Sequence, residues 1–300
     1  MNKQAKANLL MFVVTMFWGL SYTFMVMGAE TMSTFNIVAQ RCLLAFFVAG
    51  AIFYPRMKKA NTQMLKYSFI QGMFLLQVFA FSIIGLATTT AANAGFILSL
   101  TVVIVPILSS FLEKQLPSRA VGFALVCTMI GIIVLTAQGS FTFRPGDLYM
   151  ALAAVGYSIY LVLNGRFTNK VETIAYGVYQ LGFAGVGALI LCVIFDTPQL
   201  PQTTNAWIAI LGLGLVCSAF CFIAQAVVQQ HTSPTHTGLI FSAEPLFAAL
   251  FAMLFLGESL TTQVMIGGSF ILFGNLIAQM EQFHVMRYFT KKTPTKLSHE

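Results

Sequence analysis

The chain is a series of long apolar runs separated by short polar stretches. The runs are continuous rather than alternating, and most hold about twenty residues. A helix of twenty residues rises about 30 Å, the thickness of the hydrocarbon core of a bilayer. Such runs predict membrane-spanning helices and not the shorter, alternating strands of a β-barrel. The pattern predicts ten spans, at residues 8–28, 36–54, 67–86, 92–112, 119–137, 147–164, 175–195, 207–228, 237–256 and 263–281.

The composition indicates a protein that is solvated by lipid. Hydrophobic residues make up 58% of the chain and charged residues 8%, whereas a soluble domain carries about a quarter charged residues. The five cysteines all lie inside apolar runs, which favours packing residues over a disulfide framework or a metal site. We therefore expect a multi-pass protein of the cytoplasmic membrane of a bacterium, with no cofactor, no bound metal and no nucleic-acid partner.

The basic residues predict how the spans are oriented. Fourteen of the sixteen fall in segments that ten spans would place on one side of the membrane; the exceptions are Arg41 and Arg144. Positively charged loops stay in the cytoplasm, so both termini are predicted to be cytoplasmic. Residues 282–300 would form a basic cytoplasmic tail, either near anionic lipid head groups or simply solvated.

The two halves of the chain carry a weak internal repeat. An offset of 143 residues aligns Ser99 with Ser242 and Thr101 with Glu244, and similar matches keep their order along both halves. Because each half holds five spans, the second copy enters the membrane from the opposite side. The predicted fold is an all-α integral membrane protein with two inverted five-helix repeats, at residues 1–138 and 147–281. Such repeats are typical of secondary transporters, which bind substrate near the membrane midplane.

Several short motifs are shared with a known family. They are Phe17-Trp18-Gly19 in the first span, Arg41 in the second, Glu244-Pro245 in the ninth, and Gly257-Glu258 after it. Together they resemble the EamA-type permeases of the drug/metabolite transporter superfamily, although the fourth span ends at Glu113-Lys114 where that pattern has Gly-Glu. The resemblance implies ten helices around a cavity lined by spans one, three, four, six, eight and nine. It also implies export or exchange of small metabolites, often amino acids or related amphiphiles.

Polar and aromatic side chains inside the spans are the candidates for substrate binding. Gln77 and Thr88 share one face of the third span, and Ser218 and Gln225 share one face of the eighth. Such faces either line a water-filled cavity or bond neighbouring helices. The aromatic faces of the first and sixth spans suit an amphiphilic or aromatic substrate or ordinary packing. The further candidates are Trp18, Tyr22, Ser99, Tyr157, Asn164 and Ser242.

Two charged residues lie within predicted spans. Glu244 is expected about 10 Å deep from the cytoplasmic side, where removal from water favours the neutral form of a carboxyl. It is a proton carrier, a partner for a substrate amine, or a structural group that bonds a neighbouring helix. Arg41 is expected about 8 Å deep from the outside. It either extends to the interface or attracts a substrate carboxylate.

These features predict secondary active transport by alternating access. The expected protein exports or exchanges small metabolites, and the alternative is an exporter of cationic or aromatic drug-like compounds, held by Glu244 and aromatic rings. A phosphorylated substrate is disfavoured because no Lys lies in any span. A membrane enzyme would need clustered nucleophiles, which the spans lack, so no catalysis is expected. The expected partners are a small-molecule substrate, the lipid bilayer and protons, and the chain is expected to be a monomer or a homodimer.

Overall fold

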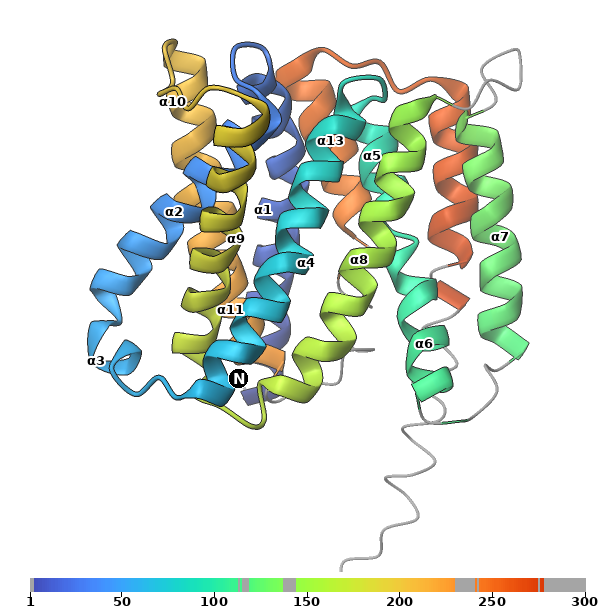
Figure 1. Cartoon of the computed structure of the whole chain (residues 1–300). Coiled ribbons are helices and arrows are strands. Elements are labelled where there is room, and N and C mark those ends of the chain that lie inside the picture. Colours follow the sequence, from blue (N-terminus) through green and yellow to red (C-terminus); the bar gives the residue numbers. More distant parts are fainter. Residues whose placement is uncertain are drawn as a thin grey trace, which may run out of the picture.

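The fold is a bundle of helices that run between two ends of the molecule (Figure 1). The computed structural model describes residues 3–112, 114, 119–136, 144–229, 241, 243–274, 276 and 277. Every regular element in these residues is a helix, which confirms the predicted all-α class. Seven helical segments are long and apolar enough to cross a membrane, and three shorter apolar helices accompany them.

The first half of the chain forms seven labelled helices. These are α1 (Lys3–Ala29), α2 (Thr34–Ile52), α3 (Tyr54–Met57), α4 (Thr62–Leu86), α5 (Ala91–Leu98), α6 (Thr101–Leu112) and α7 (Arg119–Thr136). A turn at Ser99 and Leu100 separates α5 from α6 within one apolar span. The predicted fourth span is therefore a broken helix.

The second half contains α8 (Pro145–Phe167) and α9 (Thr173–Phe195), followed by a long span over Thr204–Gln229. This span consists of α10 (Thr204–Leu211), a π-helical segment η1 (Gly212–Phe220) and α11 (Cys221–Gln229). Next come α13 (Glu244–Leu256) and a helix over Thr262–Gly274. The start of the predicted ninth span lies outside the described residues.

Large apolar side chains cover the outward faces of the helices. Val193, Ile194 and Phe195 at the end of α9 are each more than 60% exposed, as are Leu254 and Phe255 on α13. Exposed apolar surface on this scale is unfavourable in water. It fits a lipid environment, in which the outward face of a helix contacts acyl chains.

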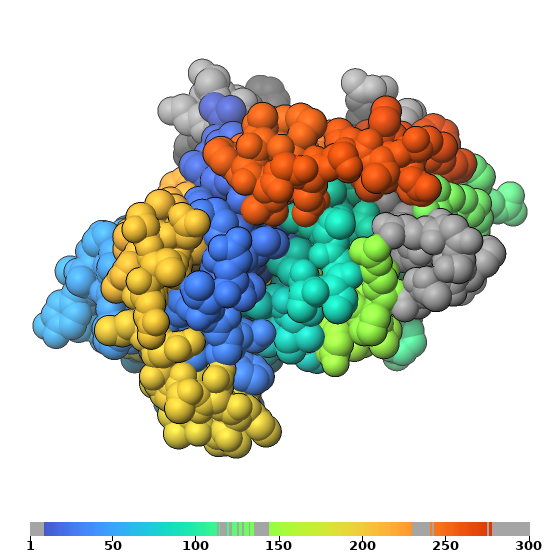
Figure 2. Space-filling view, turned by 90° about the horizontal axis from the view of Figure 1, so that it is seen from above, coloured from blue at the N-terminus to red at the C-terminus, as the bar shows by residue number. Residues whose placement is uncertain are grey.

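Close packing holds the first turns of α13 against α1 and α5. A Cβ atom at Gly19 would lie 2.5 Å from the Cβ of Phe247, and one at Gly95 would lie 2.7 Å from the Cβ of Ala248. Such contacts are too short to form, so glycine at both positions lets the three helices approach. The end-on view of Figure 2 shows the orange atoms of this C-terminal region beside the blue atoms of the N-terminal region. This packing places Glu244 against α1.

Candidate functional site

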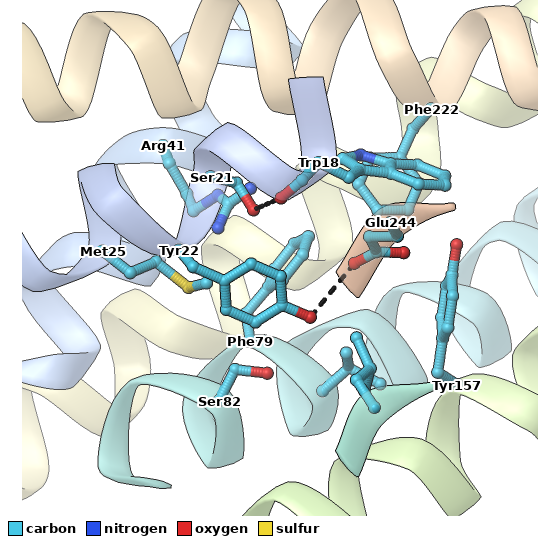
Figure 3. Close-up of a pocket in the computed structure, with 12 residues that line it drawn as sticks. Trp18, Ser21, Tyr22, Met25, Arg41, Phe79, Ser82, Tyr157, Phe222 and Glu244 are labelled. Carbon is cyan, nitrogen blue, oxygen red and sulfur yellow. Dashed lines mark hydrogen bonds between the residues drawn. The ribbon is translucent and has the colours of Figure 1, made fainter. Parts of the chain in front are cut away.

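A small cavity of about 40 Å³, measured as the space open to water-sized molecules, lies among the helices. We call it the central cavity. Its walls come from α1, α2, α4, α5, α8, α11 and α13, whereas none of the described residues of α7 lines it. The six spans expected from the family resemblance all contribute, and α2 adds one residue. The lining residues, shown in Figure 3, are Trp18, Ser21, Tyr22, Met25, Arg41, Val78, Phe79, Ser82, Leu98, Tyr157, Phe222 and Glu244.

Aromatic rings form one wall of the central cavity. The Trp18 ring centroid lies 6.0 Å from that of Tyr157, 5.1 Å from that of Phe222 and 5.0 Å from that of Phe241. The Trp18 indole N–H donates to the carbonyl oxygen of Cys217 at 3.0 Å. That carbonyl belongs to η1, and π-helical turns are frequent at functional sites. The hydrogen bond fixes the indole, so its ring presents a rigid apolar face.

The acid in the central cavity is Glu244, the first residue of α13. Its side chain is buried, and the hydroxyl of Tyr22 donates to Glu244 Oε1 at 3.0 Å (Figure 3). A second, smaller cavity adjoins the first, and Glu244 and Tyr157 line both. The predicted residue Ser99 lines this second cavity. Glu244 therefore lies between two internal spaces.

The base in the central cavity is Arg41 of α2, whose side chain is only 1% exposed. Its Nε donates to Ser218 Oγ at 3.0 Å, and its guanidinium carbon lies 4.0 Å from the centroid of the Phe79 ring. The interpretation in which Arg41 extends to the membrane interface is therefore wrong. Ser218 lies behind Arg41 and positions it without lining the cavity.

Buried amide side chains continue from the cavity toward the end of α8. Gln225 Nε2 donates to the Tyr157 hydroxyl at 3.5 Å, while Gln225 Oε1 has no partner among the described residues. Asn164 contacts Gln229, and it accepts a 2.8 Å hydrogen bond from the Tyr176 hydroxyl. Gln225 is thus adjacent to the cavity, but Asn164 belongs to a separate polar cluster.

Two predicted residues, Gln77 of α4 and Thr88 just after it, lie outside the central cavity. Gln77 is in a surface groove, where its Nε2 donates to the carbonyl oxygen of Leu152 at 3.1 Å. Thr88 is exposed at the end of the helix and accepts from the Gly146 N–H at 2.8 Å. Both residues form hydrogen bonds with the backbone of α8. Of the two alternatives for these polar faces, this is the bonding of a neighbouring helix and not the lining of a cavity. Ser242 lies outside the described residues.

The sequence pattern missed six residues that line the cavity, which are Ser21, Val78, Phe79, Ser82, Leu98 and Phe222. The cavity-facing side of α4 follows Phe79 and Ser82, so the predicted face was rotated around the helix. A signal was present in the sequence, because the polar residues Gln71 and Ser82 are three helical turns apart in an apolar span. The spacing of these polar residues could have identified this face.

The fold and the site define a multi-pass membrane protein with an internal polar cavity. The model of the EamA-like transporter family matches the chain twice, over residues 5–137 and 144–279. The chain therefore belongs to the EamA-like transporter family, and it is a membrane transporter.

Known proteins resemble the chain over most of its length. An uncharacterised transporter of Archaeoglobus fulgidus is 24% identical, over 93% of this chain and 99% of the relative. The uncharacterised transporter YdfC of Bacillus subtilis is also 24% identical, over 77% of this chain and 75% of the relative. A solved crystal structure superposes with a TM-score of 0.71 at 20% identity, over 94% of this chain and 99% of the other. That likeness concerns the fold.

Proposed function

We propose that the protein is a secondary active transporter that exports or exchanges small metabolites, such as amino acids or related amphiphilic compounds. The observation that carries this proposal is the central cavity, which combines several aromatic rings with one acid and one base inside the bundle. Small-molecule sites are mostly apolar concavities in which a few polar groups orient the ligand. A membrane protein with such a cavity has a place to hold an amphiphile between the two sides.

The proposed architecture consists of ten spans in two inverted five-helix repeats. The two family matches and the seven long plus three shorter apolar helices support it. Further support comes from Thr101 and Glu244, which the repeat aligns: each is the first residue of a helix, and a turn residue precedes each of them directly. Broken helices at matched positions of two repeats are typical of the substrate site of secondary transporters. Alternating access would follow from movement of one repeat against the other.

In the proposed mechanism Glu244 exchanges protons with one side of the membrane. Its carboxyl lies between two cavities, and no basic side chain contacts it among the described residues. A carboxylate there is stabilised by the N-terminus of α13, and it becomes neutral by taking up a proton. Coupling to a proton gradient is therefore part of the proposal.

Export of permanent cations is a weaker proposal. Glu244 and the aromatic rings would favour a cation, but Arg41 lines the same cavity and repels one. An amphiphile that carries a negative group suits the cavity better.

Transport by reconstituted protein tests the proposed function. We expect liposomes that contain the protein to accumulate at least one labelled amphiphilic metabolite faster than empty liposomes, with a rate that depends on a pH gradient. Trp18→Ala should lower this rate at least about tenfold, because it removes the ring that closes one wall and its hydrogen bond to η1. Gln77→Ala is the matched control and should transport as wild type does. The proposal would be contradicted if empty and protein-containing liposomes took up every tested metabolite at the same rate.

A further inference from the structure

We propose that Arg41 binds a carboxylate of the transported molecule, whose apolar or aromatic body lies among the rings of the central cavity. This inference rests on the proposed transport function and specifies the chemistry of the substrate at the same cavity. It starts from an unmatched charge. Arg41 is 1% exposed, yet among the described residues its side chain forms one hydrogen bond, from Nε to Ser218, and one ring contact, with Phe79.

The terminal nitrogens of Arg41 are therefore left without a hydrogen-bond acceptor in the described part of the chain. A buried cation without an anion is costly, and proteins normally pair it with an acid or an ordered ligand. The acid in this cavity, Glu244, forms no ion pair with Arg41 and instead accepts from Tyr22. The missing anion is best supplied from outside the protein.

The geometry around Arg41 favours a carboxylate as that anion. Ser218 accepts from Nε and the Phe79 ring lies against the guanidinium, so the two terminal nitrogens keep a fixed direction. Figure 3 shows the guanidinium directed toward the space between Ser21 and Tyr22. A fixed guanidinium fork matches the two oxygens of a carboxylate. A doubly charged phosphate fits less well, because Glu244 lines the same cavity and adds like charge.

The remaining walls define the rest of the molecule. Trp18, Phe79, Tyr157 and Phe222 surround the space with ring surface, which favours an aromatic or apolar body. Glu244 Oε2 has no hydrogen bond among the described residues. A simple organic acid would leave Glu244 as a neutral acid, whereas an amino acid would place its ammonium group there. The organic acid and the amino acid both carry the carboxylate that Arg41 binds.

Three ligands with one common body separate these chemistries. Phenylalanine carries both charges, 3-phenylpropionate carries the carboxylate alone, and phenethylamine carries the amine alone. The chain has two tryptophans, Trp18 in the cavity and Trp207, which is 45% exposed. In a Trp207→Phe background the fluorescence of Trp18 reports binding in detergent without any need for transport. We expect both acids to change this fluorescence, and the amine to bind at least about tenfold more weakly.

Substitutions at Arg41 complete the test. Arg41→Met should weaken binding of both acids at least about tenfold. Arg41→Lys, which keeps the charge and loses the fork, should give an intermediate loss. Arg166→Met, at an exposed position near the end of α8, is the control and should bind as the parent does.

Without ligand, Arg41→Met should unfold at a temperature no lower than the parent, because it removes a buried unpaired charge. A merely structural arginine would lower that temperature.

The outcomes distinguish this inference from the proposed function. Equal binding of the amine and the acids, absence of binding by both acids, or unchanged binding in Arg41→Met would overturn the role of Arg41. If liposomes transport only compounds without a carboxylate, the transport proposal holds and this inference fails. If the acids bind through Arg41 but no metabolite is transported, the binding site holds and the transport proposal fails. Preference for phenylalanine over 3-phenylpropionate, lost in Glu244→Gln, would identify the substrate as an amino acid and support the inference.

Discussion

Glu244 and Tyr22 form the hydrogen-bonded pair in which a proton could be held or released. Tyr22 is 222 residues away in sequence and donates to one carboxyl oxygen at 3.0 Å. The other oxygen forms no hydrogen bond with a described residue, so it is available to a proton or to an ammonium group. The structural interpretation of this acid, in which it bonds a neighbouring helix, and the proton-carrying interpretation are both compatible with this geometry. They differ in what substitution should do.

The Glu244→Gln substitution separates these interpretations. Gln keeps the size of the side chain and an acceptor oxygen for Tyr22, but it cannot release a proton. We expect accumulation driven by a pH gradient to be lost, while downhill exchange of substrate persists, measured in liposomes at fixed internal pH. A Gln variant that still accumulates substrate against its gradient would show that Glu244 is not the proton carrier. Glu244→Leu should impair both activities, because it leaves the buried Tyr22 hydroxyl unpaired at about 1–3 kcal/mol.

At the scale of elements, the turn after α13 connects two helices, α13 and α5, at one end of the bundle. Gly257 ends α13 with a φ of 67°, a left-handed conformation that glycine adopts without strain. Glu258 then accepts hydrogen bonds from the backbone N–H groups of Ala91 at 2.9 Å and Ala92 at 3.2 Å, at the start of α5. A carboxylate at a helix N-terminus is stabilised by the helix dipole. The Gly-Glu motif thus connects α13 to α5.

Removal of the Glu258 carboxylate should loosen this connection. Glu258→Ala leaves two N–H groups of α5 without their acceptor, so we expect a loss of about 1–3 kcal/mol of stability. Thermal unfolding of the purified protein in detergent measures it as a lower midpoint. Glu30→Ala is the control, because Glu30 is exposed and its side chain forms no hydrogen bond or ion pair with a described residue. An unchanged midpoint for Glu258→Ala would mean that the connection contributes little.

At the scale of the whole molecule, basic residues gather at the end that holds the N-terminus. Figure 1 shows α3 and the N-terminus at the same end of the bundle. Arg56 of α3 forms an exposed ion pair with Glu172 at 3.2 Å, so the turn between α8 and α9 lies there too. We expect this end to face the cytoplasm, because positively charged loops are retained on that side. Arg144 begins the opposite end of α8.

Labelling of single cysteines tests this orientation. The five native cysteines are buried and free, so they can be replaced before new cysteines are introduced. We expect an impermeant thiol reagent applied from outside to modify positions in 31–34, 88–91, 140–146 and 199–204, and to spare 57–65 and 230–235. The physical reason is that the basic segments are retained on the cytoplasmic side. External labelling of 57–65 would contradict both the orientation and the number of spans.

The sequence by itself determined the class of the protein and several groups of its site. Long apolar runs require helices in lipid, because each helix satisfies its own backbone hydrogen bonds. Charged and aromatic residues inside such runs are conspicuous, and this identified Trp18, Tyr22, Tyr157, Arg41 and Glu244, which all line the central cavity. Sequence spacing also placed Ser218 and Gln225 on one buried face.

The tertiary structure alone decided which polar groups face the cavity and which bond a neighbouring helix. Gln77 and Ser82 are both polar residues of one helix. Packing against α8 gives Gln77 a hydrogen bond to that helix, whereas Ser82 lines the cavity. The tertiary structure likewise decided that Arg41 lies inside the bundle, where no acid of the described residues pairs with it. Contacts between residues some 200 positions apart depend on how closely helices approach, and glycines at positions 19 and 95 set that approach here. Periodicity describes one helix at a time, so it cannot contain this information.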